Sequence, residues 1–400
     1  MRALIAGGKL QGVEAAFLAG EAGWEMVLVD RIPAPPASGI CPAFYCLDVV
    51  EEAHALCRLL DKERIDLIIP ALEDNVALRT LEKCAGAMNI PLAYDAAAYS
   101  VTHSKKRSNL LFEKLAVPQP RSWPGCGFPI IAKPSSASGS QGVIRIENEE
   151  EFGYFRERVG LGIGDWVLQE YLEGVSYSIE VLGVAGNYTA LQVTELEMDD
   201  SYDCKRVVAP ARISGLLVRR IRELALELAS GIRLKGLMDV ELVLDKDTLR
   251  VFEIDARLPS QTPVAVYQST GINMLEMLGE IFVDGTLSSV PEIENARRVV
   301  YEHVMVAGEQ QEVLGEHIMA DAGPLELIHG FFGADIGLSN FNRADLPFVA
   351  TLINSGATEE QAWAKRDGVM ENLGHYKERA VCPQEGRVAS GVAAAPLSRG

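Results

Sequence analysis

Residues 236–257 of the sequence, GLMDVELVLDKDTLRVFEIDAR, have the pattern of two β-strands joined by a tight turn. The expected strands cover 237–244 and 249–256, and the four residues between them are polar and typical of a turn. Side chains along a strand point alternately to opposite faces, so the acidic residues of each strand share one face and the apolar residues share the other. The sequence therefore predicts a hairpin with one apolar face and one acidic face.

Each strand of this hairpin contributes two carboxylates. Asp239 and Glu241 share a face of the first strand, and Glu253, Asp255 and Arg257 share a face of the second. If Glu241 pairs near Glu253, four carboxylates crowd one surface, with an arginine at its edge. Like charges directly opposite in a sheet are destabilising. We therefore expect removal of Glu253 to relieve repulsion in the metal-free protein, with little loss of fold.

A divalent cation would remove this repulsion. Hard oxygen ligands suit Mg²⁺, which usually takes one or two carboxylates together with substrate phosphates. The alternative is a solvated acidic face, which is ordinary in a chain of formal net charge −19. That alternative explains poorly why the acids alternate with apolar residues. The pattern favours a magnesium site, and with it phosphate chemistry.

Two lysines upstream are placed to contact the same phosphates. Lys133 ends the expected strand 128–133 and precedes 134–142, a loop of small residues. Such a loop lets backbone N–H groups approach phosphate oxygens, and we expect it to be a mobile flap. Lys105 lies in the basic segment 104–108. Alone, each lysine is more often a solvated surface charge, but together with the flap and the carboxylates they indicate a phosphate site.

The N-terminal part has a different rhythm. Apolar runs at 2–6, 25–30 and 65–70 predict buried strands, and helical patterns separate them. Strand, helix, strand at this spacing is typical of parallel βαβ units. After Pro291 the pattern becomes strand-like, with turns near Gly323, Gly333 and Asn340. The sequence predicts an α/β protein with more than one domain.

Composition excludes several classes of function. The chain has 400 residues, with 56 acidic and 37 basic side chains, so its surface would repel nucleic acid and anionic lipid. No apolar run approaches the ~20 residues that span a bilayer. The seven cysteines form no CxxC pair and indicate free or buried thiols in a reducing compartment. We expect a cytoplasmic protein with no nucleic-acid or membrane partner.

The ordered set of these segments resembles the ATP-grasp carboxylate–amine ligases. The resemblance covers about 105–260, and it is carried by Lys105, FPIIAK at 128–133 with its flap, QEYLEG at 169–174, DVE at 239–241 and EIDAR at 253–257. The flap is richer in serine than in many relatives. The resemblance implies an ATP-grasp fold with an N-terminal Rossmann-like parallel-sheet domain, a central ATP-binding domain and a small C-terminal domain.

The resemblance also implies domain limits and cofactors. The N-terminal domain would cover 1–98, the ATP-grasp domain 99–290 with a mobile lid at about 115–168, and the C-terminal domain 291–372. The resemblance fails from about residue 371. We expect 373–400 to be a disordered tail, because the last stretch, from about Ala380, is rich in Gly, Ala, Ser and Pro and has few large apolar residues. The cofactors would be ATP and Mg²⁺.

Roles follow residue by residue from the same resemblance. Arg257 would be catalytic, stabilising the acyl phosphate and the tetrahedral intermediate. ATP would be held by Lys9, Lys105, Lys133, Gln169, Glu170, Tyr171 and Leu172. The metal would be held by Glu241, Glu253 and Asp255, with Asp239 left open. Substrate would be bound by Leu10, Gln11, Glu73, Ser178, Asp203, Arg257 and Ser260.

A closer similarity extends to about residue 370. GGKLQG at 7–12, YDC at 202–204, LKGLMDVE at 234–241, EIDARLPSQTP at 253–263, STGIN at 269–273 and YEH at 301–303 look like the ligases of pyrrolysine biosynthesis. Those enzymes join the carboxylate of (3R)-3-methyl-D-ornithine to the ε-amine of L-lysine through an acyl phosphate. The partners implied are these two amino acids. The oligomeric state stays open, with a homodimer as one alternative.

Two other functions remain as alternatives. One is an ATP-grasp ligase for another amino-acid or peptide pair. The other is a nicotinamide-dependent oxidoreductase, because Gly7, Gly8 and Gly12 follow a strand and Asp30 ends the next one. The spacing is not G-x-G-x-x-G, so we rank pocket closure by this loop first, a plain turn second and a dinucleotide site third.

Overall fold

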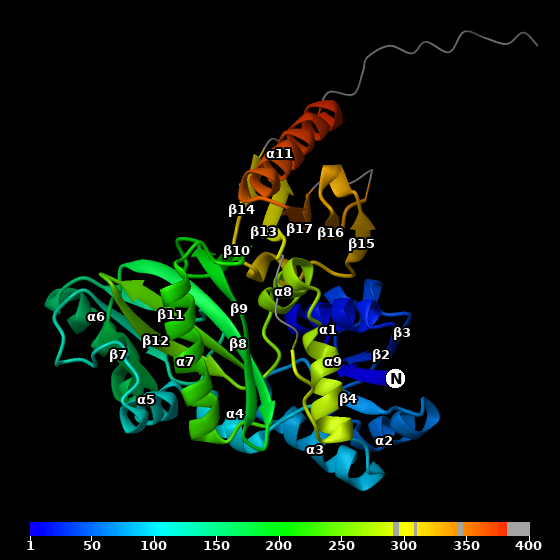
Figure 1. Cartoon of the computed structure of the whole chain (residues 1–400), viewed down its shortest axis with the longest axis horizontal. Coiled ribbons are helices and arrows are strands. Elements are labelled where there is room, and N and C mark those ends of the chain that lie inside the picture. The colour runs from blue at the N-terminus through cyan, green and yellow to red at the C-terminus, as the bar shows by residue number, and fades with distance from the viewer. Residues whose placement is uncertain (291–295, 308–309, 343–346, 382–400) are drawn as a thin grey trace, which may run out of the picture.

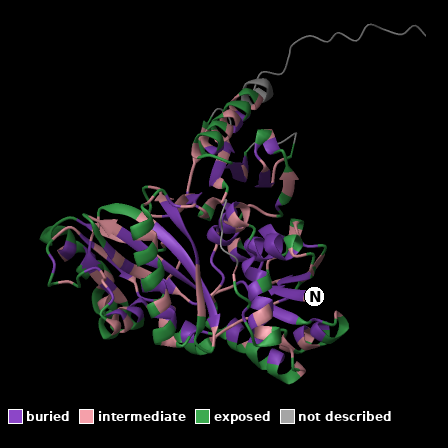
Figure 2. Ribbon diagram, viewed as in Figure 1, coloured by how far each residue is buried: buried purple, intermediate pink, exposed green. Residues whose placement is uncertain are grey.

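A computed structural model describes residues 1–290, 296–307, 310–342 and 347–381. Pro291, Cys382 and the rest of the expected tail from 382 onward lie outside the described residues. In Figure 1 the N-terminal elements (blue) lie beside the central elements (green), and the C-terminal elements (orange to red) lie above both. The strands at the centre of each part are mostly buried, as Figure 2 shows.

The N-terminal part is a parallel sheet covered by helices. Its elements are β1 (Arg2–Ala6), α1 (Leu10–Glu21), β2 (Glu25–Asp30), η1 (Pro36–Gly39), β3 (Ala43–Cys46), α2 (Ala53–Lys62), β4 (Leu67–Pro70) and α3 (Asn75–Met88). All strand pairs are parallel, in the order β3-β2-β1-β4. The predicted parallel βαβ units are confirmed. β3 was not predicted, because its four residues are mostly half-exposed and carry no clear apolar run.

A small antiparallel unit follows. Its elements are α4 (Ala96–Thr102), α5 (Lys105–Leu115), β5 (Ile130–Pro134), β6 (Ile144–Ile146), α6 (Glu149–Val159), η2 (Gly160–Asp165) and β7 (Trp166–Glu170). The sheet order is β6-β5-β7, and Phe152 and Phe155 of α6 pack against it. The small-residue loop lies between β5 and β6, as predicted. Its mobility, like the domain limits, stays a prediction.

The central sheet carries the acidic hairpin. It begins with β8 (Gly174–Val184), β9 (Asn187–Met198), β10 (Cys204–Ala209), α7 (Gly215–Ile232), β11 (Gly236–Asp245) and β12 (Thr248–Asp255). The apolar residues Met238, Val240 and Ile254 pack in one cluster with Leu224 and Leu228 of α7. Because α7 covers the apolar face, the acids of β11 and β12 are left on the opposite face. β9 and β10 were not predicted.

The C-terminal strands continue the same sheet. The elements are α8 (Thr262–Thr270), α9 (Met274–Gly279), the π-helix η3 (Glu280–Asp284), β13 (Arg298–Ala307), β14 (Gln310–Val313), α10 (His317–Ala320), β15 (Glu326–His329), η4 (Phe331–Gly333), β16 (Ile336–Ser339), β17 (Phe348–Gly356) and α11 (Glu359–Val381). The strand order is β12-β11-β8-β9-β10-β13-β17-β16-β15, and β14 pairs with β13. The predicted strand-rich character is confirmed.

One part of the expected tail is ordered. α11 runs to Val381, so residues 373–381 are helical, and the prediction of disorder from 373 is wrong for them. The physical reason is burial: Val369 and Leu373 pack against Phe331 and Phe348 in one apolar cluster. Among the described residues, no helix is long and apolar enough to cross a membrane.

Candidate active site

The acidic hairpin forms as predicted, and it extends onto a third strand. Glu241 of β11 lies opposite Glu253 of β12, and Asp239 lies opposite Asp255. On its other edge β11 pairs with β8, where Ser178 faces Glu241 and Glu180 faces Asp239. Two rows of side chains therefore cross three adjacent strands: Ser178, Glu241 and Glu253 in one row, and Glu180, Asp239 and Asp255 in the next. The second row holds three carboxylates.

The two predicted lysines approach the first row. Lys105 Nζ lies 2.8 Å from Oε1 of Glu253, and Lys133 Nζ lies 3.7 Å from its Oε2. Both lysines are buried. Lys105 starts α5 and Lys133 lies on β5, so the helix and the lid strand bring cations from about 120–150 residues upstream onto the hairpin. The structure places these lysines between the flap and the carboxylates.

Each carboxylate of the site experiences a different local field. Desolvation raises the pKa of Glu241 well above its usual range, and the charges of Asp239 and Glu253 add to the rise. Desolvation acts in the same direction on Glu253, but Lys105 and Lys133 hold the pKa of that carboxyl below its usual value. Burial raises the pKa of Asp239 to about 6 and that of Glu180 to about 8. The field beside the lysines therefore favours the charged form of Glu253, whereas the surroundings of Glu241 in the same row, and of Asp239 and Glu180 in the second row, disfavour charge.

A cavity of about 430 Å³ lies over this face. At one end it is lined by Lys105, Ile131, Lys133, Phe252 and Gln169–Leu172. The carboxylate of Glu170 is bound by the backbone N–H and Nε of Arg121, at 2.8 and 2.7 Å. Glu170 therefore contacts the lid through its side chain. This arrangement is consistent with a segment that offers its backbone, rather than its carboxylate, to a base.

Arg257 lies at the boundary between the hairpin and the N-terminal part. Its Nε is 2.7 Å from Asp255 Oδ2, and its Nη2 is 2.8 Å from Glu73 Oε1. The same Glu73 oxygen accepts a hydrogen bond from Gln11 Nε2 at 2.8 Å, and the other oxygen accepts one from Ser138 of the flap. Burial disfavours the charged guanidinium, but Asp255 and Glu73 raise the pKa of Arg257 above its ordinary value. Glu73 joins α1, the flap and Arg257.

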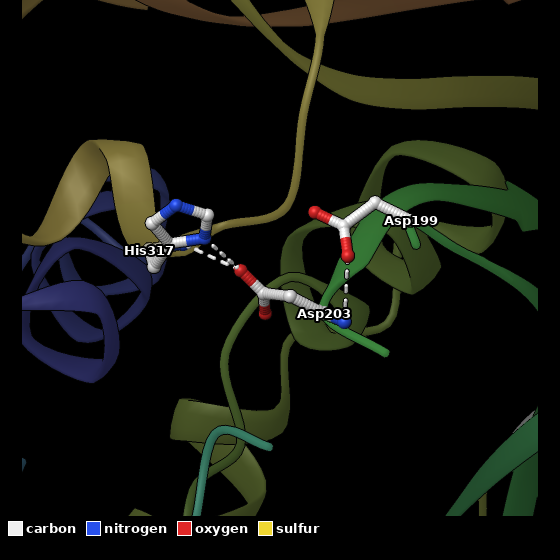
Figure 3. Close-up of side chains that lie close together, drawn as sticks. All are labelled: Asp199, Asp203 and His317. Carbon is white, nitrogen blue, oxygen red and sulfur yellow. Dashed lines mark hydrogen bonds and ion pairs between the residues drawn. The ribbon is translucent and has the colours of Figure 1, made fainter. Parts of the chain in front are cut away.

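The other end of the cavity is rich in acceptors. Ser178, Asp203 and Ser260 line it, as expected for substrate contacts, and so do Asp199 and Glu316. Figure 3 shows Asp203 pointing toward the imidazole of His317, whose backbone N–H lies 3.0 Å and whose Nδ1 lies 2.5 Å from Oδ2 of Asp203. Asp199 Oδ1 accepts from the backbone N–H of Asp203 at 3.1 Å. This end of the cavity suits a ligand that carries N–H donors.

Four predicted site residues, Lys9, Leu10, Gln11 and Glu73, do not line the cavity among the described residues. Lys9 Nζ lies 2.9 Å from the exposed Asp321, and Leu10 packs against the main apolar cluster. Glu73 reaches the site through its contacts with Arg257 and with Ser138 of the flap, and Gln11 through its hydrogen bond to Glu73. The roles assigned to these four residues stay predictions.

The glycine loop forms a tight turn. A Cβ at Gly8 would lie 2.7 Å from Pro35 Cγ, and one at Gly12 would lie 2.2 Å from the Gly7 carbonyl oxygen. Asp30, the candidate ribose acid, accepts hydrogen bonds from the backbone N–H groups of Gly8 and Ile32, at 2.6 and 2.8 Å. The glycines serve close helix–strand packing, which favours the plain turn over the first-ranked pocket closure and over a dinucleotide site.

Several cavity residues were missed from the sequence. They are Ile131, Phe252, Leu196, Met198, Asp199, Gln261 and Glu316. Glu180, which does not line the cavity but belongs to the second carboxylate row, was missed as well. Glu180 alternates with Ser178 on β8, so the strand pattern held a signal for it. Asp199 directly follows β9, and Glu316 lies shortly after β14. They are far apart in sequence, so no local spacing predicts that they meet. The order of strands in the sheet brings the two residues together.

Comparisons with known proteins agree with this geometry. Residues 103–261 match the family model described as ATP-grasp domain. A biotin carboxylase of Campylobacter jejuni has the same fold, with a TM-score of 0.70 at 15% identity over 96% of this chain and 95% of that one. An L-amino acid ligase of Bacillus licheniformis has a TM-score of 0.66 at 18% identity over 93% and 97% of the two chains. The predicted ATP-grasp fold is confirmed, and the class is that of ATP-grasp enzymes.

Similarity over nearly the whole chain is more specific. The 3-methyl-D-ornithine–L-lysine ligase of Methanosarcina barkeri is 33% identical over 94% of this chain and 97% of its own length. The enzyme of the same name from Methanosarcina acetivorans is 32% identical over 90% and 94%. The chain belongs to the family of 3-methyl-D-ornithine–L-lysine ligases, and it is an ATP-dependent carbon–nitrogen ligase. The predicted family is confirmed, and the oxidoreductase alternative is wrong.

Proposed function

We propose that the protein joins the carboxylate of (3R)-3-methyl-D-ornithine to the ε-amine of L-lysine, with ATP consumed, as a step of pyrrolysine biosynthesis. The observation that carries the proposal is the cavity that runs from buried Lys105 and Lys133 over the carboxylate rows to the acceptor-rich end at Asp203. One end fits a triphosphate and the other fits cationic amino acids. The names of its relatives indicate which amino acids these are.

The donor set fits Mg²⁺. Glu241, Glu253 and Asp255 present hard oxygen atoms from two paired strands, and Oδ1 of Asp255 is buried without a hydrogen-bond partner. A buried carboxylate oxygen without a partner is costly unless a cation or a donor completes it. When bound there, Mg²⁺ would neutralise charge on phosphate oxygens. Asp239, bound by Ser178 Oγ, is the less available carboxylate of the hairpin.

The chain's own groups suit a two-step ligation. Lys105 and Lys133 would hold the phosphates of ATP while the substrate carboxylate attacks the γ-phosphorus, which gives ADP and an acyl phosphate. The ε-amine of lysine then attacks the acyl carbon, and phosphate and a proton leave. Arg257 would stabilise the oxyanion of the tetrahedral intermediate. Phosphorylation is needed because a carboxylate is a poor electrophile at neutral pH.

The flap would exclude water during these steps. Ser138 of the flap contacts Glu73, and Ser140 Oγ donates to the backbone oxygen of Tyr202 at 2.5 Å. Both contacts cross from the lid, at about 115–168, to other parts of the molecule. A closed flap would protect the acyl phosphate from hydrolysis. We propose the same limits as before for the first two domains, 1–98 and 99–290, and a C-terminal domain that starts at 291 and includes α11.

Acidic groups would select the amino acids. Asp203 and Ser260 at the far end and Ser178 on β8 offer acceptors to ammonium groups. Glu73 and Gln11 at the border with α1 are proposed to contact a substrate, with Glu73 also bound by Arg257. The reaction consumes ATP and is proposed for the cytoplasm. A homodimer remains one alternative for the assembly.

Mass spectrometry of the reaction products tests the proposal. The protein is incubated with ATP, Mg²⁺, 3-methyl-D-ornithine and L-lysine, and ADP is measured in parallel. We expect the condensation product of the two amino acids, formed together with ADP, and none without ATP. L-ornithine and a panel of other amino-acid pairs serve as competitors. Ligation of a different pair in preference to this one would refute the substrate assignment while keeping the ligase class.

A further inference from the structure

Glu14 is a buried carboxylate in the middle of α1 that the proposed reaction does not use. Its exposed fraction is 1%, and its helical neighbours Ala15, Ala16 and Phe17 are apolar and buried. Burial raises its pKa to about 8, against hydrogen bonds from the backbone of Val264 and Gln261 and from Tyr301. Burying a carboxyl group is unfavourable unless hydrogen bonds compensate for the lost water, so the partners of Glu14 show what the group does there.

One partner of Glu14 lies at the start of α8 and the other on β13. The Val264 N–H donates to Oε2 at 2.9 Å, and the Tyr301 hydroxyl donates to Oε1 at 3.0 Å. The residue before α8, Gln261, makes no side-chain hydrogen bond to the N–H groups of that helix. Helices need their first N–H groups satisfied. Glu14 therefore caps α8 from a different part of the molecule.

The segment that Glu14 holds is strained and lines the cavity. Gln261 has φ 69° and ψ −54°, a conformation that a residue with a side chain rarely adopts. Such a conformation persists only where neighbouring groups enforce it. Gln261 Nε2 donates to the Cys204 backbone oxygen at 3.0 Å, which holds the side chain, and Glu14 holds the backbone on the other side.

We propose that Glu14 is a positioning residue that holds the loop 257–262 in its binding conformation. This loop runs from Arg257 through Ser260 to Gln261 and Thr262, all of which line the cavity. One turn earlier on α1 lies Gln11, which contacts Glu73 and through it Arg257. A single helix would thus set both the loop and the Glu73–Arg257 pair. The kinetic part of this inference depends on the proposed function.

The same two helices provide a matched control. Near the other end of α1, Glu21 Oε2 accepts a hydrogen bond from the Tyr267 hydroxyl of α8 at 2.8 Å. Glu21 is exposed and does not line the cavity among the described residues. Glu14→Leu and Glu21→Leu therefore each remove a carboxylate of α1 that accepts a hydrogen bond from α8, from the Val264 N–H in the first case and from the Tyr267 hydroxyl in the second, but only the first contact caps α8 at the loop.

Hydrogen exchange of the free protein tests the structural part. In Glu14→Leu the amides of 257–264 should exchange at least about tenfold faster, since Val264 N–H loses its acceptor, while the core strands stay protected. Glu14→Gln should restore protection, because an amide oxygen also accepts from Val264. Glu21→Leu should match wild type. Equal exchange in Glu14→Leu and Glu21→Leu would overturn the proposal.

Steady-state kinetics tests the positioning role. Glu14→Leu should raise KM for the amino acids about tenfold and leave KM for ATP within about twofold, because the loop lines the amino-acid end of the cavity. Equal rises for ATP and amino acids would assign Glu14 to general stability and overturn the proposal. If Glu14→Leu does not fold, Tyr301→Phe, which removes one donor to Glu14, should show a smaller effect in the same direction. If wild type does not ligate the two amino acids, the proposed function fails, and the exchange contrast still decides the role of Glu14.

Discussion

Lys105 Nζ lies 2.8 Å from Oε1 of Glu253, and that carboxylate faces Glu241 across the hairpin. Repulsion between the two glutamates is therefore not the dominant interaction of Glu253 in the metal-free protein. Lys133 approaches its second oxygen at 3.7 Å. The two buried lysines neutralise the negative charge of Glu253 in the free protein, and we expect them to turn to the phosphates when ATP binds. The lysines and the carboxylates form one charge-balanced site that can exchange partners when nucleotide and metal bind.

This contact reverses one expectation. Glu253→Gln should destabilise the metal-free protein by about 1–2 kcal/mol, because it leaves two buried lysines without their counter-ion and the site is only partly exposed. Urea unfolding measures the change, with Asp247→Asn in the exposed turn of the hairpin as the control. Turnover should be abolished. A gain in stability would show that repulsion between the carboxylates dominates after all.

Substitution of two adjacent lysines tests whether Lys105 contacts phosphate, with Lys106 as a surface lysine for comparison. Lys105 is buried beside Glu253, whereas Lys106 is exposed. Lys105→Ala should raise KM for ATP about tenfold to hundredfold, the effect of losing a hydrogen bond to a charged group. Lys106→Ala should leave KM for ATP unchanged, as measured by the rate of ADP formation. Equal effects of the two substitutions would remove Lys105 from the nucleotide site.

The contact between Ser138 and Glu73 predicts how closely ATP use and ligation are coupled. Ser138→Ala removes a hydrogen bond that ties the flap to the N-terminal part, so water should reach the acyl phosphate more often. The ratio of ADP to ligated product should rise at least about twofold. Ser136→Ala, on an exposed position of the same loop, is the control. A ratio that stays at the wild-type value in Ser138→Ala would argue against the contact as part of closure.

Glu14 predicts a pH dependence of stability. Its pKa is raised from 4.5 to about 8 by burial, so between these values the folded chain keeps a proton that the unfolded chain has lost. The free energy of unfolding should therefore fall as pH rises through this range, by up to about 1.4 kcal/mol per pH unit for this group. Glu14→Gln should make the decline shallower, while Glu180, whose pKa is also raised to about 8, contributes a slope of the same sign in both proteins.

Thermal unfolding across pH measures this difference, with Glu21→Gln as the exposed control. Parallel pH profiles for wild type and Glu14→Gln would contradict a raised pKa for Glu14.

Much of the site followed from local pattern. The alternation of Asp239 and Glu241 with apolar residues predicted the shared face, whereas the pairing of Glu241 with Glu253 was only a condition of that prediction and depends on a register shift between Glu241 and Leu242. Lys133 was identified because it ends a strand and precedes a small-residue loop. These inferences hold because strand periodicity and turn chemistry are short-range properties. Lys9, which rested on resemblance alone, instead pairs with Asp321 outside the cavity.

The sequence by itself determined the acidic hairpin, the parallel N-terminal sheet and the family. The first two depend on the spacing of residues close together in the chain, and the third on an ordered set of motifs. Only the tertiary structure decided that Glu180 extends the carboxylate rows, that Glu14 caps α8 and that Asp199 and Glu316 share the end of the cavity. These residues are brought together by strand order and helix packing, which depend on long-range burial of apolar faces. No local pattern in one sequence reports which distant segments will meet.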